Sequence, residues 1–327
     1  MVGTGPVAGR RPAGLFVGLC TLDVIQLVDH VPGPDEKLTA RDQVVAAGGP
    51  ATGAAVAFAR LGGLPRLLTG LGTHPLALGV RADLDALGVR VTDLAADRVE
   101  PPAVSSVLVT ASTGQRAVAS TNATGHRLRA PADSAGLLEL EELVVSCDIA
   151  EFDGHHMDLA VDVARAARSA GRRTVLDGGS WKDGTERLLP STDVAVCSAD
   201  FHPPGTGTPA ETLDFLHDHG VTWAAVTAGG APITWSGPGC GGLVGVPETR
   251  VVDTLGAGDV LHGALAHHLS GPAPIDGPAF AEALARAATV ASHACASFGT
   301  RAWLTADGSA GTLALGGDRP GRRADGW

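Results

Sequence analysis

The sequence predicts an α/β fold: a mostly parallel central sheet with helices on both faces, and a small β lid. Three observations predict it. Short apolar runs alternate with alanine-rich helical patterns, short glycine-rich joins separate them, and two segments with strand-type alternation interrupt this rhythm. The chain has 327 residues, of which 44% are hydrophobic, and shows no internal repeat or low-complexity linker. We therefore expect one compact domain over residues 13–315, with flexible tails at 1–12 and 316–327.

The centre of the predicted fold is a set of buried strands, each a short apolar run. They are expected at 15–20, 67–71, 174–176, 194–197 and 224–227. Helices are expected at 50–61, 159–170, 260–269 and 280–296. In the first helix, Ala54, Ala57, Phe58 and Leu61 recur at the spacing of one helix face. Pro50 fits its first turn, where a missing N–H costs nothing.

Two segments, near residues 24–45 and 104–120, are expected to form the lid. The first alternates as a strand does, through Val24, Gln26 and Val28, without a helical pattern. The second has the pattern of a hairpin with its turn at residues 112–114. Together they predict a small sheet that covers the mouth of the main sheet. Because exposed strand edges need a partner, we also expect a homodimer joined through the lid.

Composition narrows the classes of partner. The formal net charge is −11, from 24 Lys and Arg against 35 Asp and Glu, and an acidic surface repels phosphate backbones, so nucleic-acid binding is not expected. No apolar run reaches the roughly 18 residues of a membrane span, so no membrane association is expected. The five cysteines are scattered and odd in number. Their spacing disfavours a disulfide framework or a zinc site and indicates a cytoplasmic protein.

The strongest chemical signal is the run Asp253–Asp259 (DTLGAGD), directly before a predicted helix. Gly256 and Gly258 allow tight or left-handed backbone angles, so that successive N–H groups at a helix N-terminus form an anion site. Asp259 alone would most simply cap the helix, but a cap does not need two preceding glycines. Amides that hold an anion, beside a carboxylate that can take a hydroxyl proton, suit phosphoryl transfer.

Two weaker glycine-rich turns accompany this run. Gly48-Gly49-Pro50 precedes the first predicted helix and would let a small ligand approach the backbone, although a plain strand-to-helix turn explains it about as well. Thr227-Ala228-Gly229-Gly230 follows a buried strand and could face nucleotide phosphates, although such turns are common.

Other signatures are missing from the sequence or have simpler explanations. No G-x-x-x-x-G-K-[ST] run exists, which excludes a P-loop kinase. A metal site at His155-His156 is disfavoured because adjacent side chains rarely face one ion. His267-His268 is expected on a solvated helix face, and His262 is expected to pack rather than to catalyse.

Two runs resemble the signatures of the ribokinase-like (PfkB) sugar kinases: DTLGAGD, and GGPATGAAVAFARLG from Gly48 to Gly62. The first strand, followed by GLCTLD up to Asp23, fits as well, and the resemblance spans about residues 14–304. It implies a three-layer ribokinase-like fold with a β lid, and an ATP-dependent kinase. The wording GGPA and CSADF is most similar to fructose-type and sulfofructose-type kinases.

At the reaction centre, the resemblance implies that Asp259 is the base, because the Asp that ends the motif has this role in the family. The anion hole would consist of the backbone amides of Gly256, Ala257 and Gly258.

For the ligands, the resemblance implies that Asp23 contacts sugar hydroxyls, with Gly48 and Gly49 nearby. The residues implied for the nucleotide are Thr227, Gly229, Thr254 and Gly256. ATP and Mg²⁺ follow as cofactors.

The chain departs from the family pattern at two places. Gly53 stands where the family usually has an Asn that helps to hold the sugar. Residues 198–201 (SADF) stand where most members have an Asn-x-x-Glu that organises the water shell of Mg²⁺. Asp200 is the candidate for holding Mg²⁺ through water.

We therefore expect a kinase that transfers the γ-phosphoryl group of ATP to a hydroxymethyl group of a small sugar. A nucleoside or vitamin-alcohol kinase is the alternative within the fold, and the lid is poor in aromatics that could stack a base. A non-catalytic regulator that binds a sugar or a nucleotide is the alternative from another functional class. The intact Asp259 argues against it, because such a regulator would not need the base. A dehydrogenase is a third alternative. Lys37 is either a solvated lid residue or, with Arg41, a partner for an anionic sugar.

Overall fold

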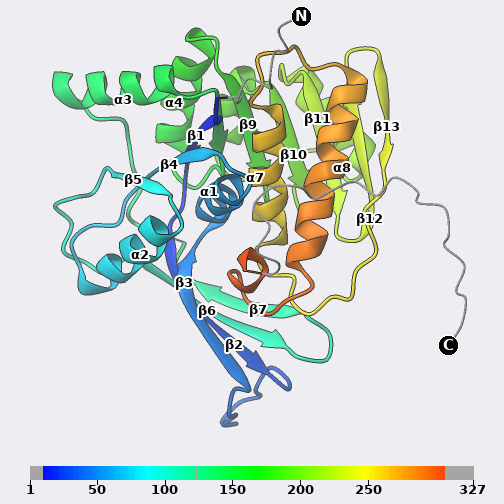
Figure 1. Cartoon of the computed structure of the whole chain (residues 1–327). Coiled ribbons are helices and arrows are strands. Elements are labelled where there is room, and N and C mark those ends of the chain that lie inside the picture. Colours follow the sequence, from blue (N-terminus) through cyan, green and yellow to red (C-terminus); the bar gives the residue numbers. More distant parts are fainter. Residues whose placement is uncertain (1–9, 123, 306–327) are drawn as a thin grey trace, which may run out of the picture.

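The computed structural model describes residues 10–122 and 124–305, and its centre is a nine-stranded sheet (Figure 1). The strand order is β13-β12-β11-β10-β9-β8-β1-β4-β5. The strands are β1 (Ala13–Val17), β4 (Leu64–Thr69), β5 (Arg90–Asp93), β8 (Ile149–Phe152), β9 (Arg173–Gly178), β10 (Val194–Ser198), β11 (Trp223–Ala228), β12 (Ala231–Gly237) and β13 (Cys240–Val244). From β11 to β5, all neighbouring strands pair in parallel. At the other edge, β12 pairs antiparallel with both β11 and β13.

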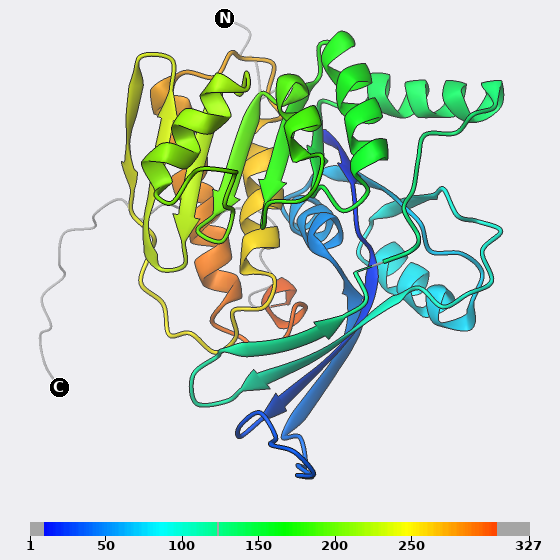
Figure 2. The ribbon, with the colours of Figure 1, turned by 180° about the vertical axis from the view of Figure 1, so that it is seen from behind.

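Helices cover both faces of this sheet. On the face toward the viewer in Figure 1 lie α1 (Pro50–Arg60), α2 (Pro75–Ala86), α7 (Ala257–Leu269) and α8 (Gly277–Ala294). On the other face, seen in Figure 2, lie α3 (Ser134–Ser146), α4 (Met157–Ser169), α5 (Thr185–Leu188) and α6 (Pro209–Asp218). Two 3₁₀ turns complete the described part: η1 (Leu189–Ser191) and η2 (Ala302–Leu304).

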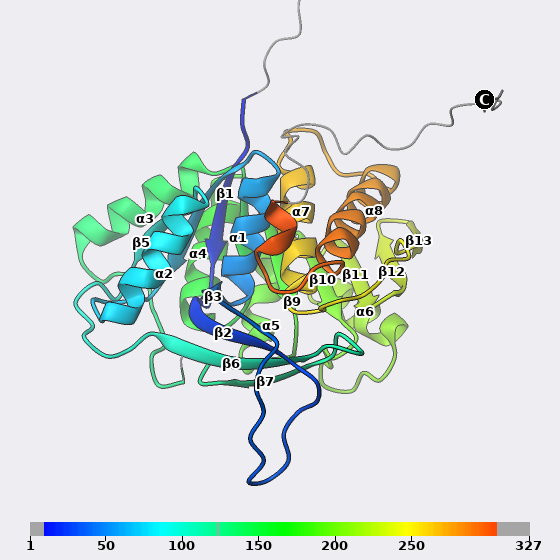
Figure 3. The same ribbon diagram turned by 60° about the horizontal axis from the view of Figure 1, so that its bottom comes forward.

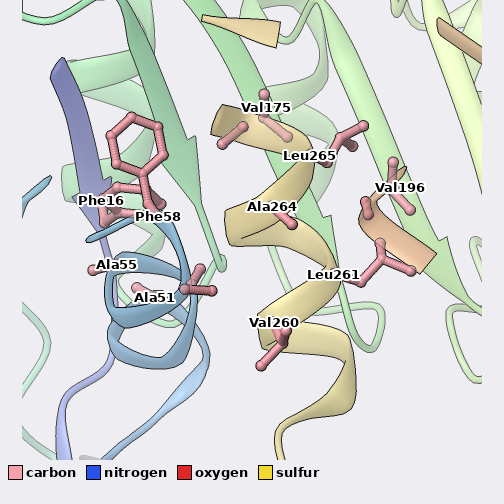
Figure 4. Close-up of a cluster of buried hydrophobic side chains, with 14 of the residues drawn as sticks. Phe16, Ala51, Ala55, Phe58, Val175, Val196, Val260, Leu261, Ala264 and Leu265 are labelled. Carbon is pink, nitrogen blue, oxygen red and sulfur yellow. The ribbon is translucent and has the colours of Figure 1, made fainter. Parts of the chain in front are cut away.

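The core is divided by the sheet because successive strand residues point to opposite faces. Phe16 and Val175 pack with Phe58 of α1 and Leu265 of α7 on one face (Figure 4). Their chain neighbours, such as Leu176, pack under the helices of the other face. A sheet buried on both faces explains why its strands are continuous apolar runs.

The second sheet has four strands and lies across one end of the central sheet (Figure 3). Its order is β3 (Asp42–Gly48), β2 (Thr21–Val28), β6 (Ala103–Thr110), β7 (Arg116–Ser120). Ile25, Val107 and Val109 on its inner face pack with Leu255 and Phe298 from the body. The loop that joins β2 to β3 projects away from the body (Figure 3). The predicted fold class, a mostly parallel sheet between helices with a small β lid, is confirmed.

Several elements were not predicted. The helices α2, α3 and α6, the strands β5 and β8, and the antiparallel pair β12–β13 had no counterpart in the sequence pattern. In α3, Leu137 and Leu138 are exposed, so its apolar residues do not mark one clean face. The first strand ends at Val17 rather than at Cys20.

The expected tails fall largely outside the described residues, which exclude 1–9 and 306–327. Of the expected N-terminal tail, Arg10 forms an ion pair with Asp148, and Arg11 donates hydrogen bonds to the carbonyl oxygens of Gly62 and Gly63 at 2.7 and 2.9 Å. Arg10 and Arg11 are therefore attached to the rest of the domain by these contacts. Among the described residues, no helix is long and apolar enough to cross a membrane.

Candidate functional site

A pocket lies where the lid meets α1 and α7. It brings together residues from four distant parts of the chain: Asp23, Gly48, Gly49, Gly53, Gly256, Asp259, Arg301 and Trp303 are among its lining residues. Five of the residues singled out in the sequence as site candidates therefore meet here: Asp23, Gly48, Gly49, Gly256 and Asp259.

The DTLGAGD run forms the turn that starts α7. Gly256 adopts a left-handed conformation with φ 73° as the N-cap, and the helix begins at Ala257. Asp253 fixes the turn by accepting hydrogen bonds from the N–H groups of Leu255 (2.8 Å) and Gly299 (2.9 Å). The Ala257 N–H donates to the Thr254 carbonyl at 3.3 Å. Gly256 lines the pocket, so the N-terminus of α7, where an anion site is expected, lies at the pocket wall.

Asp259 occupies the first turn of α7, at the pocket wall. Burial raises the pKa of its carboxyl to about 7, and the nearby carboxylates of Asp177 and Asp23 act in the same direction. His262 and Arg116 oppose this rise in pKa. A carboxyl whose pKa lies near neutrality is matched to accept and release a proton at working pH.

Asp23 reaches the pocket from β2 and is 7% exposed. Its carboxylate accepts a hydrogen bond from the Thr21 hydroxyl at 2.6 Å, and burial raises its pKa. A Cβ on Gly48 would collide with this carboxylate, so only glycine lets β3 approach Asp23 so closely. The early Asp and the double glycine, 25 positions apart in the sequence, form one wall.

The lid is tied to the DTLGAGD turn through Thr254. The Gly114 carbonyl accepts from the Thr254 N–H (3.3 Å) and hydroxyl (3.2 Å), and Arg116 Nη1 donates to Thr254 Oγ1 at 3.0 Å. Sequence reasoning missed Arg116 because a single arginine at the start of a strand carries no local signal.

Arg301 holds the opposite wall. Its Nη2 donates to the Ala47 carbonyl (2.6 Å) and to Asp83 (2.8 Å), while the Ala47 N–H donates to the same Asp83 oxygen (2.9 Å). This contact fixes the end of β3 directly before Gly48. Trp303, 5% exposed, also lines the pocket. No motif in the sequence pointed to either residue.

The remaining candidates are not among the residues that line the pocket. Thr227 is the penultimate residue of β11, and Asp200 lies two residues after the end of the neighbouring strand β10. Both are at the carboxyl edge of the sheet, where ligands bind in parallel sheets. The Thr227 hydroxyl donates to the Cys197 carbonyl at 3.4 Å, and Gly229 has φ 58° with open space beside it. Lys37 is exposed in the projecting loop, where Arg41 forms an ion pair with Asp29.

The side chains of the histidine pairs contact other residues of the protein. His155 Nδ1 lies 3.2 Å from Asp153, and His156 Nδ1 accepts from the Leu128 N–H at 3.4 Å. Among the described residues, no three His, Cys, Asp or Glu side chains are grouped to hold a metal ion. The expectation that His267 is solvated was wrong, because its ring packs edge-on against Phe58 with centroids 5.4 Å apart.

Known proteins resemble this chain in sequence and in fold. The model of the pfkB family carbohydrate kinases matches residues 15–306. A protein from Agrobacterium tumefaciens provisionally named a ribokinase superposes with a TM-score of 0.78 at 24% identity, covering 90% of this chain and 94% of its own. A ribokinase from Arabidopsis thaliana, solved with ribose and ATP, has a TM-score of 0.68 at 22% identity (88% and 94%). An adenosine kinase from Sinorhizobium meliloti has a TM-score of 0.72 at 18% identity (89% and 96%).

Proposed function

The chain belongs to the pfkB family of carbohydrate kinases and is thus a phosphotransferase, and we propose that it transfers the γ-phosphoryl group of ATP to a hydroxymethyl group of a small sugar. One observation carries this proposal. The carboxyl of Asp259, with its pKa near 7, shares a pocket with Asp23 and stands in the first turn of a helix whose N-terminus is suited to an anion.

The proposed role of each residue follows from its chemical groups and its position in the pocket. Asp23 would accept hydrogen bonds from sugar hydroxyls, because an ionised carboxylate only accepts. Asp259 would take the proton of the attacking hydroxyl as the new O–P bond forms and the bond to the leaving phosphate of ATP breaks. The amides of residues 256–258 would hold the transferring group.

The nucleotide would extend from this helix terminus toward the carboxyl ends of β10 and β11. Thr227, Gly229, Thr254 and Gly256 are the residues proposed to bind it. The open space beside Gly229 fits a phosphate or ribose close to the backbone.

A Mg²⁺ ion would enter with ATP rather than occupy a protein cage. The described residues offer no three-ligand cluster, which fits an ion that keeps several waters and binds phosphates. Asp200, exposed after β10, is proposed to hold one of those waters. When bound, the ion would offset phosphate charge.

We further propose a cytoplasmic homodimer. The five cysteines, all in the described part of the chain, are free thiols, as a reducing compartment would keep them. The lid strands β3 and β7 are the edges of their sheet and carry the exposed side chains of Val45 and Val118. Pairing of two lids would cover both.

A substrate screen tests the proposed reaction. We expect ADP release from ATP to require one class of small sugar, with thermal stabilisation by that same sugar. The panel includes neutral and anionic sugars, nucleosides and vitamin alcohols. ADP release with a nucleoside but with no sugar would contradict the proposed substrate class, and stabilisation by sugars without any turnover would favour a regulator.

A further inference from the structure

His262 lies one turn after Asp259 on α7 and is 5% exposed. Its two ring nitrogens both face carbonyl oxygens of the backbone. Nδ1 is 2.8 Å from the Gly258 oxygen, and Nε2 is 2.9 Å from the Val196 oxygen at the centre of β10. Asp177 Oδ2 of β9 lies 3.5 Å from Nδ1.

These partners determine which protons the ring must carry. A carbonyl or carboxylate oxygen accepts and does not donate, so each nitrogen can satisfy its partner only as an N–H. A neutral imidazole has one N–H and would turn a lone pair toward the other carbonyl. Only the doubly protonated ring matches both contacts, and the Asp177 carboxylate favours that cation.

The cation would lie inside a group of acidic side chains. Asp259 faces Asp177 from β9 and Asp23 from β2, and Glu151 of β8 is fully buried with neither carboxyl oxygen hydrogen-bonded in the described part of the chain. Apart from His262, the positive group that acts on Asp259 is Arg116 of β7 in the lid. The carboxylates of Asp177 and Asp23 disfavour an ionised Asp259, because like charges in a buried site repel. Burial raises the pKa of Glu151, so this side chain is held neutral and cannot supply a compensating positive charge.

We propose that His262 is held as an imidazolium cation by Gly258, Val196 and Asp177, and that it is a positioning residue that keeps Asp259 ionised. The inference rests on the proposed role of Asp259 as the base, since only the ionised carboxylate can accept the substrate proton. His262 touches no substrate in this account and acts through Asp259. Its positive charge offsets the negative charges of the carboxylates around Asp259.

The first test needs no substrate. In ¹⁵N-histidine-labelled protein at pH 7.5, where an ordinary histidine is mostly neutral, we expect two protonated ring nitrogens for one residue. His262→Asn, or His262→Gln where the shorter side chain does not fold, should remove that pair of signals. His267→Asn on the same helix is the matched control and should leave it in place. An unprotonated ring nitrogen on His262 would overturn the proposal.

The second test is the pH profile of kcat/KM. Wild type should lose activity below about pH 7, where Asp259 takes up its proton. In His262→Asn the acid limb should move up by about one pH unit, because a positive neighbour lost from a buried site raises the pKa of a carboxyl. Activity should recover toward the wild-type level at pH 9.

The two tests separate the possible failures. An equal loss of activity at every pH, or an unmoved acid limb, would contradict the positioning role. His267→Asn should keep the wild-type profile. A protein that phosphorylates nothing would count against the proposed kinase reaction, whereas the charge of His262 would still be decided by the nitrogen signals.

Discussion

A Cβ atom on Gly53 of α1 would lie 2.7 Å from the Cβ of Asp259 and 2.8 Å from its Oδ2. The two helices touch again one turn further on, where a Cβ on Gly263 would collide with the Ala54 carbonyl. Glycines on each helix thus allow α1 and α7 to pack at backbone distance. The position and burial of the proposed base therefore depend on a residue with no side chain.

Gly53→Ala should lower the activity of the protein while changing its stability little. Alanine favours the helix by about 1 kcal/mol, which offsets part of the roughly 1–3 kcal/mol cost of overpacking. The methyl group must displace Asp259, so we expect kcat to fall about 10- to 100-fold while the thermal midpoint changes little. Gly79→Ala on α2, with open space around it, is the control and should lose no activity. Equal kcat values for Gly53→Ala and wild type would refute this coupling.

Arg116→Met should weaken the connection between the lid and the DTLGAGD turn. It removes the 3.0 Å bond to Thr254 and a positive charge that lowers the pKa of Asp259. We expect kcat/KM for the sugar to fall about tenfold, and to fall further at pH 6.5 than at pH 8.5, because more Asp259 is then protonated. Arg286→Met, which removes an arginine paired with Glu282 on α8, should leave the profile unchanged. The same response from both variants would exclude a specific role for Arg116.

The sequence allowed prediction wherever short-range pattern decides structure. Val194–Cys197 is buried at every position, so its apolar run marked a strand directly. The DTLGAGD turn was recognisable because glycine spacing determines where the backbone can turn. By contrast, the Arg116–Thr254 bond joins residues 138 positions apart, and no local spacing encodes it.

Two histidines also show that tertiary contacts could not be predicted from the sequence. His262 was expected only to pack, and it is indeed buried, but its two carbonyl partners come from α7 and from β10, 66 positions away for the second. His267 was expected to be solvated, and the tertiary contact with Phe58 covers it. The burial of a polar side chain and its hydrogen-bond partners depend on which helices and strands pack together in the fold. The sequence pattern alone does not contain this information.

Lys37→Met tests whether the substrate is anionic. Lys37 is exposed in the loop between β2 and β3, so a role requires this loop to fold toward the pocket. In that closed state we expect the variant to raise KM for an anionic sugar tenfold or more, about 1.4 kcal/mol, because an ion pair in a partly dry pocket is strong. A matched neutral sugar should be unaffected. Equal effects on both sugars, or none on either, would leave Lys37 a solvated loop residue.

Light scattering tests the proposed homodimer. We expect twice the chain mass at micromolar concentration. The double variant Val45→Asp, Val118→Asp, which changes both lid edges, should be a monomer. A charge buried against an apolar partner strand is costly, so the dimer should dissociate. Leu138→Asp on α3, a similarly exposed apolar side chain, should remain dimeric. Wild type that is monomeric under these conditions would disprove lid pairing.

The kcat of Asp259→Asn on the best sugar, measured beside ATP binding by the same protein, tests the central claim most directly. Asparagine keeps the shape of the side chain but cannot take the hydroxyl proton. We expect ATP binding and the fold to be retained, and kcat to fall about 10²–10⁴-fold. A variant that phosphorylates the sugar at a rate near that of wild type would show that Asp259 is not the base.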